Sequence, residues 1–275
     1  MSTAIVRQPA VAGRFYPRDP EELRHEVRDY LVPLRSGTPT PVHAIGCVVP
    51  HAGYMYSGHV AGAVFSRLII PQRCIVLCPN HTGMGRALAI MSEGIWQTPL
   101  GEVPIDAQLS VALMQRFPAL QEDSAAHRAE HAIEVELPFL QVCQPALTFV
   151  PLALGTIQLE ILEQLGAALA DVIAAESDPV LIVASSDMNH YESDPITRAK
   201  DHRAIERILT LDPHGLHEVV TQQNISMCGL GPAVAMLTAA RTLGAKSAEL
   251  VKYATSGDVS GDRATVVGYA GVVIK

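Results

Sequence analysis

The stretch CIVLCPNHTGMG, residues 74–85, carries the pattern that decides the fold. Its first half, from Cys74 to Pro79, is apolar at every position instead of alternating between apolar and polar residues. A short run of this kind predicts a strand that is covered on both faces of a sheet. The second half is polar and rich in glycine, which predicts a loop at the carboxyl end of that strand. His81 lies in this loop.

The same order of a buried strand and a histidine-bearing loop occurs twice more. IGCVVP at residues 45–50 is followed by His51, and VLIVAS at residues 180–185 is followed by a polar segment that ends at His190. Further strand patterns lie at residues 88–92, 147–154, 249–253 and 265–274. Helical patterns lie at residues 57–68, 106–117, 131–142, 157–175, 195–210, 212–221 and 231–243.

Strands therefore alternate with helices along most of the chain. This alternation predicts an α/β fold, a three-layer α/β/α sandwich with a mostly parallel central sheet. Since no internal repeat, low-complexity segment or linker divides the sequence, residues 1–275 are expected to form a single domain. The proline-rich stretch at residues 33–41 is expected to be a loop before the first core strand.

Composition and charge argue against several classes of function. Of the 275 residues, 48% are apolar and 17% charged, which is ample for a sizeable core. The net charge of −8 argues against nonspecific nucleic-acid binding, which depends on clustered Lys and Arg. The long uncharged stretches are all interrupted by Pro, Gly or polar residues, and the first residues lack a secretory-signal pattern. We therefore expect a soluble, cytoplasmic protein without membrane contact; a homodimer is compatible with the low charge.

Three histidines are expected to meet in one crevice. His51, His81 and His190 each follow a buried strand, and ligands of open α/β sheets bind beyond the carboxyl ends of the strands. Imidazole is the commonest protein metal ligand and the usual acid or base near neutral pH. Taken singly, each histidine is equally well explained as a helix cap or a loop hydrogen-bonding residue, but the three together favour a site.

Asp187 and Cys228 are the other candidates from sequence. Asp187 lies three residues before His190 and is placed either to orient an imidazole or a metal-bound water, or to cap the next helix. Cys228 lies in a turn before an apolar helix, where its thiol could ligate a metal, act as a nucleophile or simply be buried. The number of cysteines is five, which fits reduced thiols; Cys74 and Cys78 are expected to be buried on one strand face.

The segment EHAIEVE, residues 130–136, is a weaker candidate. If this segment is helical, His131 and Glu134 share a face and could line a site, although acids at a helix start are the default interpretation. The spacing is not that of a zinc protease, and neither a phosphate loop nor a serine-hydrolase motif is present. Six other histidines lie in polar contexts and are expected at the surface: His25, His43, His127, His202, His214 and His217.

The chain resembles the Memo family, also described as component B of the AmmeMemoRadiSam system. Matching blocks run in order over nearly the whole chain, so the likeness is specific although each block is short. The blocks are AGRFYP at 12–17, PHAGY at 50–54 with YSG at 56–58, PNH at 79–81, TPLG at 98–101, EHAIEVELPF at 130–139, SSDMNHY at 185–191, CG at 228–229 and YATSGD at 253–258.

The resemblance implies a fold similar to class III extradiol dioxygenases, in which two histidines and a carboxylate hold non-haem iron(II). Mapped by motif, His51, His81 and Cys228 correspond to the metal set, with Asp187 and His190 beside it. The cysteine stands where the dioxygenases use glutamate. A thiolate favours redox chemistry with iron or copper and departs from the ligand set of two histidines and one carboxylate. Iron(II) is therefore expected first, then copper, then zinc.

The leading hypothesis from sequence is a metal-dependent, dioxygenase-like oxidoreductase that acts on an unidentified small molecule or peptide. His190 would be its general acid or base, oriented by Asp187, with His131 as a further cleft residue. One alternative is a non-catalytic module that binds a peptide, phosphopeptide or small anion in the same cleft. Another is a hydrolase that uses zinc-bound water. The resemblance also implies a functional link to a radical SAM protein and an AMMECR-type protein.

Overall fold

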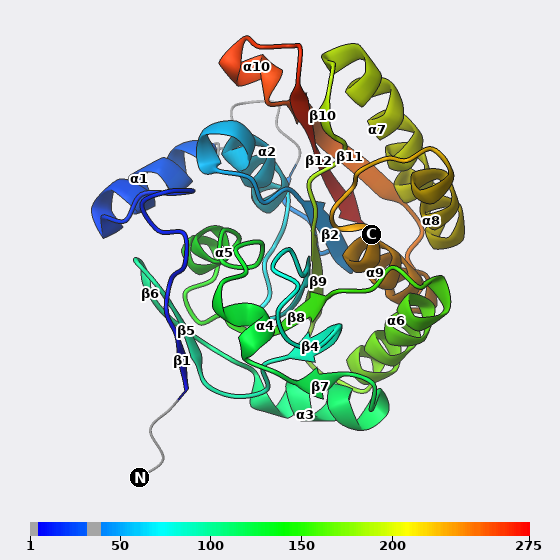
Figure 1. Ribbon diagram of the computed structural model, residues 1–275. Coiled ribbons are helices and arrows are strands. Elements are labelled where there is room, and N and C mark those ends of the chain that lie inside the picture. Colours follow the sequence, from blue (N-terminus) through cyan, green and yellow to red (C-terminus); the bar gives the residue numbers. More distant parts are fainter. Residues whose placement is uncertain (1–4, 32–39) are drawn as a thin grey trace.

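A nine-stranded mixed sheet runs through the middle of the protein, with helices packed on both faces (Figure 1). The computed structural model describes residues 5–31 and 40–275, so the loop expected at residues 33–41 lies almost entirely outside the described residues. The four central strands are parallel neighbours. In spatial order they are β2 (Gly46–Val49), β9 (Val180–Ser185), β3 (Arg73–Pro79) and β8 (Thr148–Leu154).

The strands outside this centre are mostly antiparallel. On one side β12 (Val266–Ile274) pairs with β2 and in turn carries β11 (Ala248–Thr255) and β10 (His190–Glu192). On the other side β4 (Leu88–Ile90) runs antiparallel to β8, and β7 (Gln121–Glu122) is parallel to β4. The predicted α/β class with a largely parallel central sheet is confirmed, whereas the antiparallel borders were not predicted.

Alternate residues of the central strands enter two separate cores, which is why these strands are apolar at every position. On β3, Ile75 and Leu77 belong to one core while Cys74, Val76 and Cys78 belong to the other, so the two cysteines do share a buried face as predicted. The first core is covered by α3 (Ala107–Arg116), α6 (Leu159–Ala174), α7 (Asp194–Leu209), α8 (Pro213–Gln222) and α9 (Leu230–Thr242). The second is covered by α1 (Pro20–Tyr30), α2 (Tyr54–Ser66) and α5 (Leu137–Cys143).

A small three-stranded sheet beside the second core was not predicted from the sequence. It consists of β1 (Val6–Arg7), β5 (Ile95–Thr98) and β6 (Gly101–Pro104). The short helices α4 (Ala125–Arg128) and α10 (Gly257–Ser260) complete the described elements. No helix in residues 5–31 and 40–275 has both the length and the apolar character needed to cross a bilayer.

Two local predictions were wrong. The helix expected at residues 131–142 begins only at Leu137, because residues 132–136 form turns instead. Three buried glutamates, Glu130 just before these turns and Glu134 and Glu136 within them, contact separate partners. His127 was expected at the surface but is fully buried, with its ring 5.7 Å from that of Trp96. The aromatic partner lies on the unpredicted small sheet, so the polar sequence around His127 gave no sign of it.

Asp194 fixes the start of α7 and thereby the chain that follows β10. Its Oδ2 accepts hydrogen bonds from Arg198 at 2.9 Å and from Arg263 at 2.8 Å, and its Oδ1 accepts one from Thr255 at 2.6 Å. The hydrogen bond from Arg198 contributes most to lowering the pKa of Asp194 to about 2. These contacts tie α7 to β11 and to the segment before β12.

We expect Asp194→Asn to lower the free energy of unfolding at pH 7 by about 1 kcal/mol, because both arginines are partly exposed and screened by solvent. The stabilisation is complete above the ordinary pKa near 3.8 and is lost as the pH falls through about 2. Urea unfolding at pH 7 and at pH 2.5 measures the difference, with the exposed Asp178→Asn as control. If Asp194→Asn loses as much free energy of unfolding at pH 2.5 as at pH 7, the stabilising role of the ionised Asp194 would be contradicted.

Candidate metal centre

Three side chains meet at the carboxyl ends of the central strands. His51 follows β2, His81 follows β3, and Cys228 lies just before α9. One ligand atom from each of these residues lies within 4.8 Å of the other two. The Sγ of Cys228 is 3.2 Å from Nε2 of His51. The structure thus brings together the two histidines and the cysteine that the sequence singled out.

Two hydrogen-bonding contacts fix the position of His51. Its Nδ1 lies 2.8 Å from the Oγ of Ser185, the last residue of β9, and its backbone N–H donates to Asp187 Oδ1 at 2.8 Å. Burial, together with the neighbouring histidines, lowers the pKa of His51 well below its ordinary value. The ring is therefore neutral near pH 7, and its Nε2 is the nitrogen that faces Cys228.

His81 is fixed by a single carboxylate. Its backbone N–H donates to Glu130 Oε2 at 2.6 Å, and its Nδ1 lies 2.9 Å from Oε1. The carboxylate also accepts the backbone N–H groups of His131 at 2.9 Å and Ala132 at 3.0 Å. Burial alone would raise the pKa of Glu130, but the hydrogen bond and charge of His81 together with the backbone donors lower it. An ionised Glu130 therefore orients His81 and leaves its Nε2 free.

Cys228 is enclosed by the loop that follows β9. Its Sγ accepts a hydrogen bond from the backbone N–H of Asp187 at 3.3 Å, and a side chain at the next position, Gly229, would collide with Ser186. Burial raises the pKa of the Cys228 thiol, and nearby Asp187 adds to the effect. The cysteine is therefore a neutral thiol when no metal is bound, which does not suit a free nucleophile.

Asp187 ties the loops together but does not orient His190. Its carboxylate accepts the backbone N–H of His51, and its own N–H reaches Cys228. Burial raises the pKa of Asp187 to about 7. The imidazole of His190 is instead oriented by Ser226, whose carbonyl oxygen lies 2.8 Å from Nδ1. The predicted contact between Asp187 and His190 was therefore wrong, and so was the alternative in which Asp187 caps α7, since Ser193 precedes that helix.

A cavity of about 300 Å³ opens beside these residues. Its lining joins histidines to aromatic rings and includes neither Lys nor Arg among the residues that the structure describes. Tyr191 is 76% exposed and holds a φ of 62°, a conformation unusual for a bulky residue. The lining residues are Phe15, His51, Ala52, Gly53, His81, His131, Asp187, His190, Tyr191, Val267 and Tyr269.

His131 reaches the cavity, whereas Glu134 does not. The ring of His131 stacks on that of His81 with centroids 4.7 Å apart and lies 4.8 Å from the ring of Phe15. Glu134 points away and accepts hydrogen bonds from the backbone of Ala10 at 2.8 Å and from Tyr16 at 2.6 Å. His131, His81 and Glu130 also form a second group with close ligand atoms, but the Glu130 carboxylate already accepts hydrogen bonds from the backbone N–H groups of residues 81, 131 and 132.

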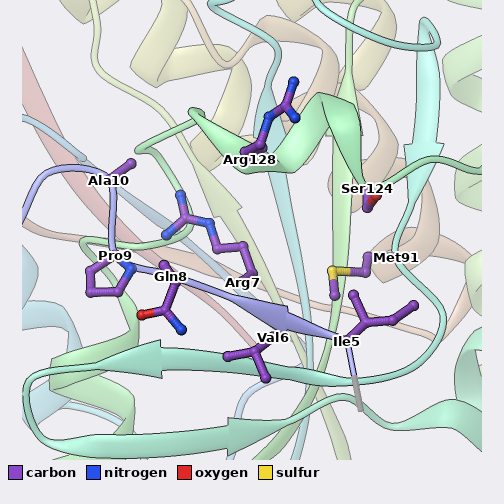
Figure 2. A pocket seen from close by; sticks show the side chains of 9 residues that line it. All are labelled: Ile5, Val6, Arg7, Gln8, Pro9, Ala10, Met91, Ser124 and Arg128. Atoms are coloured by element: carbon purple, nitrogen blue, oxygen red, sulfur yellow. The ribbon is translucent and has the colours of Figure 1, made fainter. Parts of the chain in front are cut away.

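A second cavity, of about 350 Å³, lies beside β1, between residues 5–10 and the side chains of Met91, Ser124 and Arg128 (Figure 2). Arg7 borders it, yet the guanidinium is fully engaged with the Glu134 carboxylate, with the Glu130 carbonyl at 2.6 Å and with the Trp96 ring at 4.3 Å. The side chains around it are Ile5, Val6, Arg7, Gln8, Pro9, Ala10, Met91, Ser124 and Arg128. This cavity contains none of the predicted site residues.

Sequence reasoning missed the residues that hold the ligands in place. In the sequence Glu130 is only the first residue of an acidic motif, and nothing marks Ser185 or Ser226 as part of a site. Their spacing carries no signal of its own, because each acts on a residue more than 30 positions away.

We expect Glu130→Gln to lower the free energy of unfolding by about 1.5–3 kcal/mol, because the amide replaces an acceptor with a donor that faces buried N–H groups. Urea unfolding compares it with the wild type and with the exposed Glu93→Gln. Unfolding midpoints that match for all three proteins would show that Glu130 does not hold this segment.

Comparison with known proteins places the chain in a family. The model of the Memo-like protein family matches residues 7–273. MEMO1 family proteins of Methanopyrus kandleri and Methanothermobacter thermautotrophicus are 44% and 41% identical over 279 and 274 residues, covering 98% and 97% of this chain and 99% of each relative. The crystal structure of an uncharacterized protein of Escherichia coli K12 shares the fold, with a TM-score of 0.54 at 13% identity over 83% of this chain and 98% of that one. The chain belongs to the Memo-like protein family.

Proposed function

We propose that His51, His81 and Cys228 hold iron(II) or copper, and that the protein uses this metal for redox chemistry on a small organic or peptide substrate. The observation that carries the proposal is the hydrogen bonding of the two histidine rings. Each has its Nδ1 occupied, by Ser185 in one case and Glu130 in the other, so that each Nε2 is left to bind a metal. Metal-binding histidines in proteins are oriented in this way by a partner of the second ring nitrogen.

The donor set is compatible with a redox metal. Two imidazoles and one thiolate bind iron, copper and zinc, and of these three metals iron and copper are redox-active. Bound iron or copper would supply one-electron chemistry and open positions for oxygen or substrate. Iron(II) is proposed first because the family resemblance implies a fold similar to that of class III extradiol dioxygenases. Zinc in the same place would instead point to hydrolysis.

His190 is the proposed acid or base. Its Nδ1 faces the Ser226 carbonyl, which only accepts hydrogen bonds, so Nδ1 carries the proton and Nε2 keeps its lone pair. Burial lowers the pKa of His190, which keeps the ring neutral near pH 7. The residue lines the cavity and is therefore placed to take a proton from a bound substrate.

The walls of the cavity indicate what the substrate presents to them. Phe15, Tyr191 and Tyr269 offer aromatic surface, and the ring of His131 stacks on that of His81 and is tilted against that of Phe15. These rings suit a flat or apolar group. They also support the alternative of a binding module that captures a peptide without turnover. The lining offers no Arg or Lys among the described residues, so a phosphate group gains no support from it.

Metal content tests the proposal. We expect protein purified without oxygen and without a metal-affinity tag to contain near-stoichiometric iron or copper by elemental mass spectrometry. Cys228→Ser and His51→Ala should lose most of it, because each removes one of three ligands. Cys143→Ser and His25→Ala, which change a cysteine and a histidine outside the site, should keep it.

Other outcomes of these measurements would contradict the proposal. Circular dichroism shows whether each variant is folded, so a loss of metal cannot be confused with unfolding. A folded wild type that takes up no iron, copper or zinc on reconstitution would overturn the proposal and leave the binding module. If the wild type contains zinc and Cys228→Ser loses it, the proposed site would stand, but the proposed chemistry would change from redox chemistry to hydrolysis.

A further inference from the structure

A buried glutamate lies behind His51 and has no part in the function proposed above. Glu136 is fully buried, and its Oε1 lies 2.9 Å from the hydroxyl oxygen of Ser185. That hydroxyl is also 2.8 Å from Nδ1 of His51 and 2.9 Å from the carbonyl oxygen of Ala132. Ser185 therefore has three polar neighbours. Counting the hydrogen-bond donors and acceptors shows which of these groups carry protons.

The hydroxyl of Ser185 has one hydrogen to donate and two lone pairs to accept. The Ala132 carbonyl can only accept, so it must receive the hydroxyl hydrogen if it is to be bonded at all. The two lone pairs are then left for His51 and Glu136, and both must donate. All three contacts are satisfied in one arrangement only, with a proton on Nδ1 of His51 and a proton on Oε1 of Glu136.

The alternative, an ionised Glu136, leaves buried groups without partners. The carboxylate would take the hydroxyl hydrogen and deprive the Ala132 carbonyl of this bond. Its Oε2 has no hydrogen-bond partner among residues 5–31 and 40–275, and no ion pair of Glu136 is present within those residues. A buried charge in that setting is far more costly than a neutral acid. Burial correspondingly raises the pKa of Glu136 well above its ordinary value, and the charge of Asp187 adds to this.

We propose that Glu136 is a neutral carboxylic acid that donates to Ser185, and that the two residues act as a positioning pair for His51. Together they keep the proton of His51 on Nδ1, so that the lone pair of Nε2 faces Cys228 and His81. The purpose of this arrangement rests on the proposed metal-binding function. The tautomer and the protonation of Glu136 are properties of the metal-free protein, and they can be measured whether or not a metal binds.

Infrared spectroscopy tests the protonation of Glu136. At pH 8.5 the wild type should show the carbonyl stretch of a protonated carboxylic acid, and Glu136→Gln should lose that band. Asp187 and Asp201, whose pKa values burial raises to about 7 and about 6, are ionised at this pH and do not contribute. Asp201→Asn is the matched control for another buried carboxyl group and should keep the band. A wild type without the band would overturn the proposal.

Nitrogen-15 NMR of the metal-free protein tests the tautomer, with the His51 signals assigned by their loss in His51→Gln. We expect Nδ1–H in the wild type and in Glu136→Gln, because the amide of glutamine can also donate to Ser185. Ser185→Ala removes the acceptor of the Nδ1 proton and should shift His51 toward Nε2–H. Ser110→Ala removes a buried serine hydroxyl in α3 and should leave the tautomer unchanged. An Nε2–H tautomer in the wild type, or an unchanged one in Ser185→Ala, would contradict the inference.

Metal affinity supplies the link to function. Ser185→Ala should weaken iron(II) binding by about tenfold to a hundredfold, the usual effect of losing the partner of a metal-binding histidine. Glu136→Gln should bind as tightly as the wild type, because a neutral donor is retained. A glutamine variant that binds as weakly as Ser185→Ala would show that an ionised Glu136 is required, and the inference would fail. If the wild type binds no metal, the proposed function fails while the spectroscopic results still decide the inference.

Discussion

Hydrogen bonding between three parallel strands determines where the two histidine ligands of the candidate site lie. β9 pairs with β2 on one side and β3 on the other, and the register sets Val49 beside Ser185. The chains that leave these strands therefore emerge at the same edge of the sheet, His51 from β2 and His81 from β3. Ser185, at the end of the middle strand, lies directly behind His51. A change in this register would move the ligands apart, whatever their identity.

Three glutamates in one short segment perform three different tasks. Glu130 is ionised and orients His81, Glu134 is paired with Arg7 and anchors the amino-terminal segment, and Glu136 is buried behind Ser185. Turns, rather than a helix, make this division possible, since consecutive helical turns would place the side chains at positions 130 and 134 on one face. The segment thus connects the small sheet to the candidate metal centre. The differing environments of the three carboxyl groups, not their sequence, decide which carry charge.

The sequence was informative where burial dominates and much less so where single hydrogen bonds decide. Uniformly apolar runs indicated the central strands, and the loops after them identified His51, His81 and His190 as neighbours. Cys228 lies in a turn outside the apolar runs, which left metal binding, nucleophilic attack and simple burial open, and only the family resemblance assigned it to the metal set. By contrast, the orientation of His190 depends on a backbone carbonyl, that of Ser226, which no residue type encodes. The burial of His127 depends on Trp96, a residue of a sheet whose strands are too short to show a pattern.

Two imidazoles and one thiolate are proposed to bind a metal at the edge of this sheet. X-ray absorption spectroscopy at the edge of the bound metal tests this most directly, because sulfur is distinguished from nitrogen and oxygen as a neighbour of the metal. We expect one sulfur neighbour together with imidazole nitrogen in the wild type, and no sulfur in Cys228→Ser. A wild-type spectrum with nitrogen and oxygen neighbours alone would contradict it.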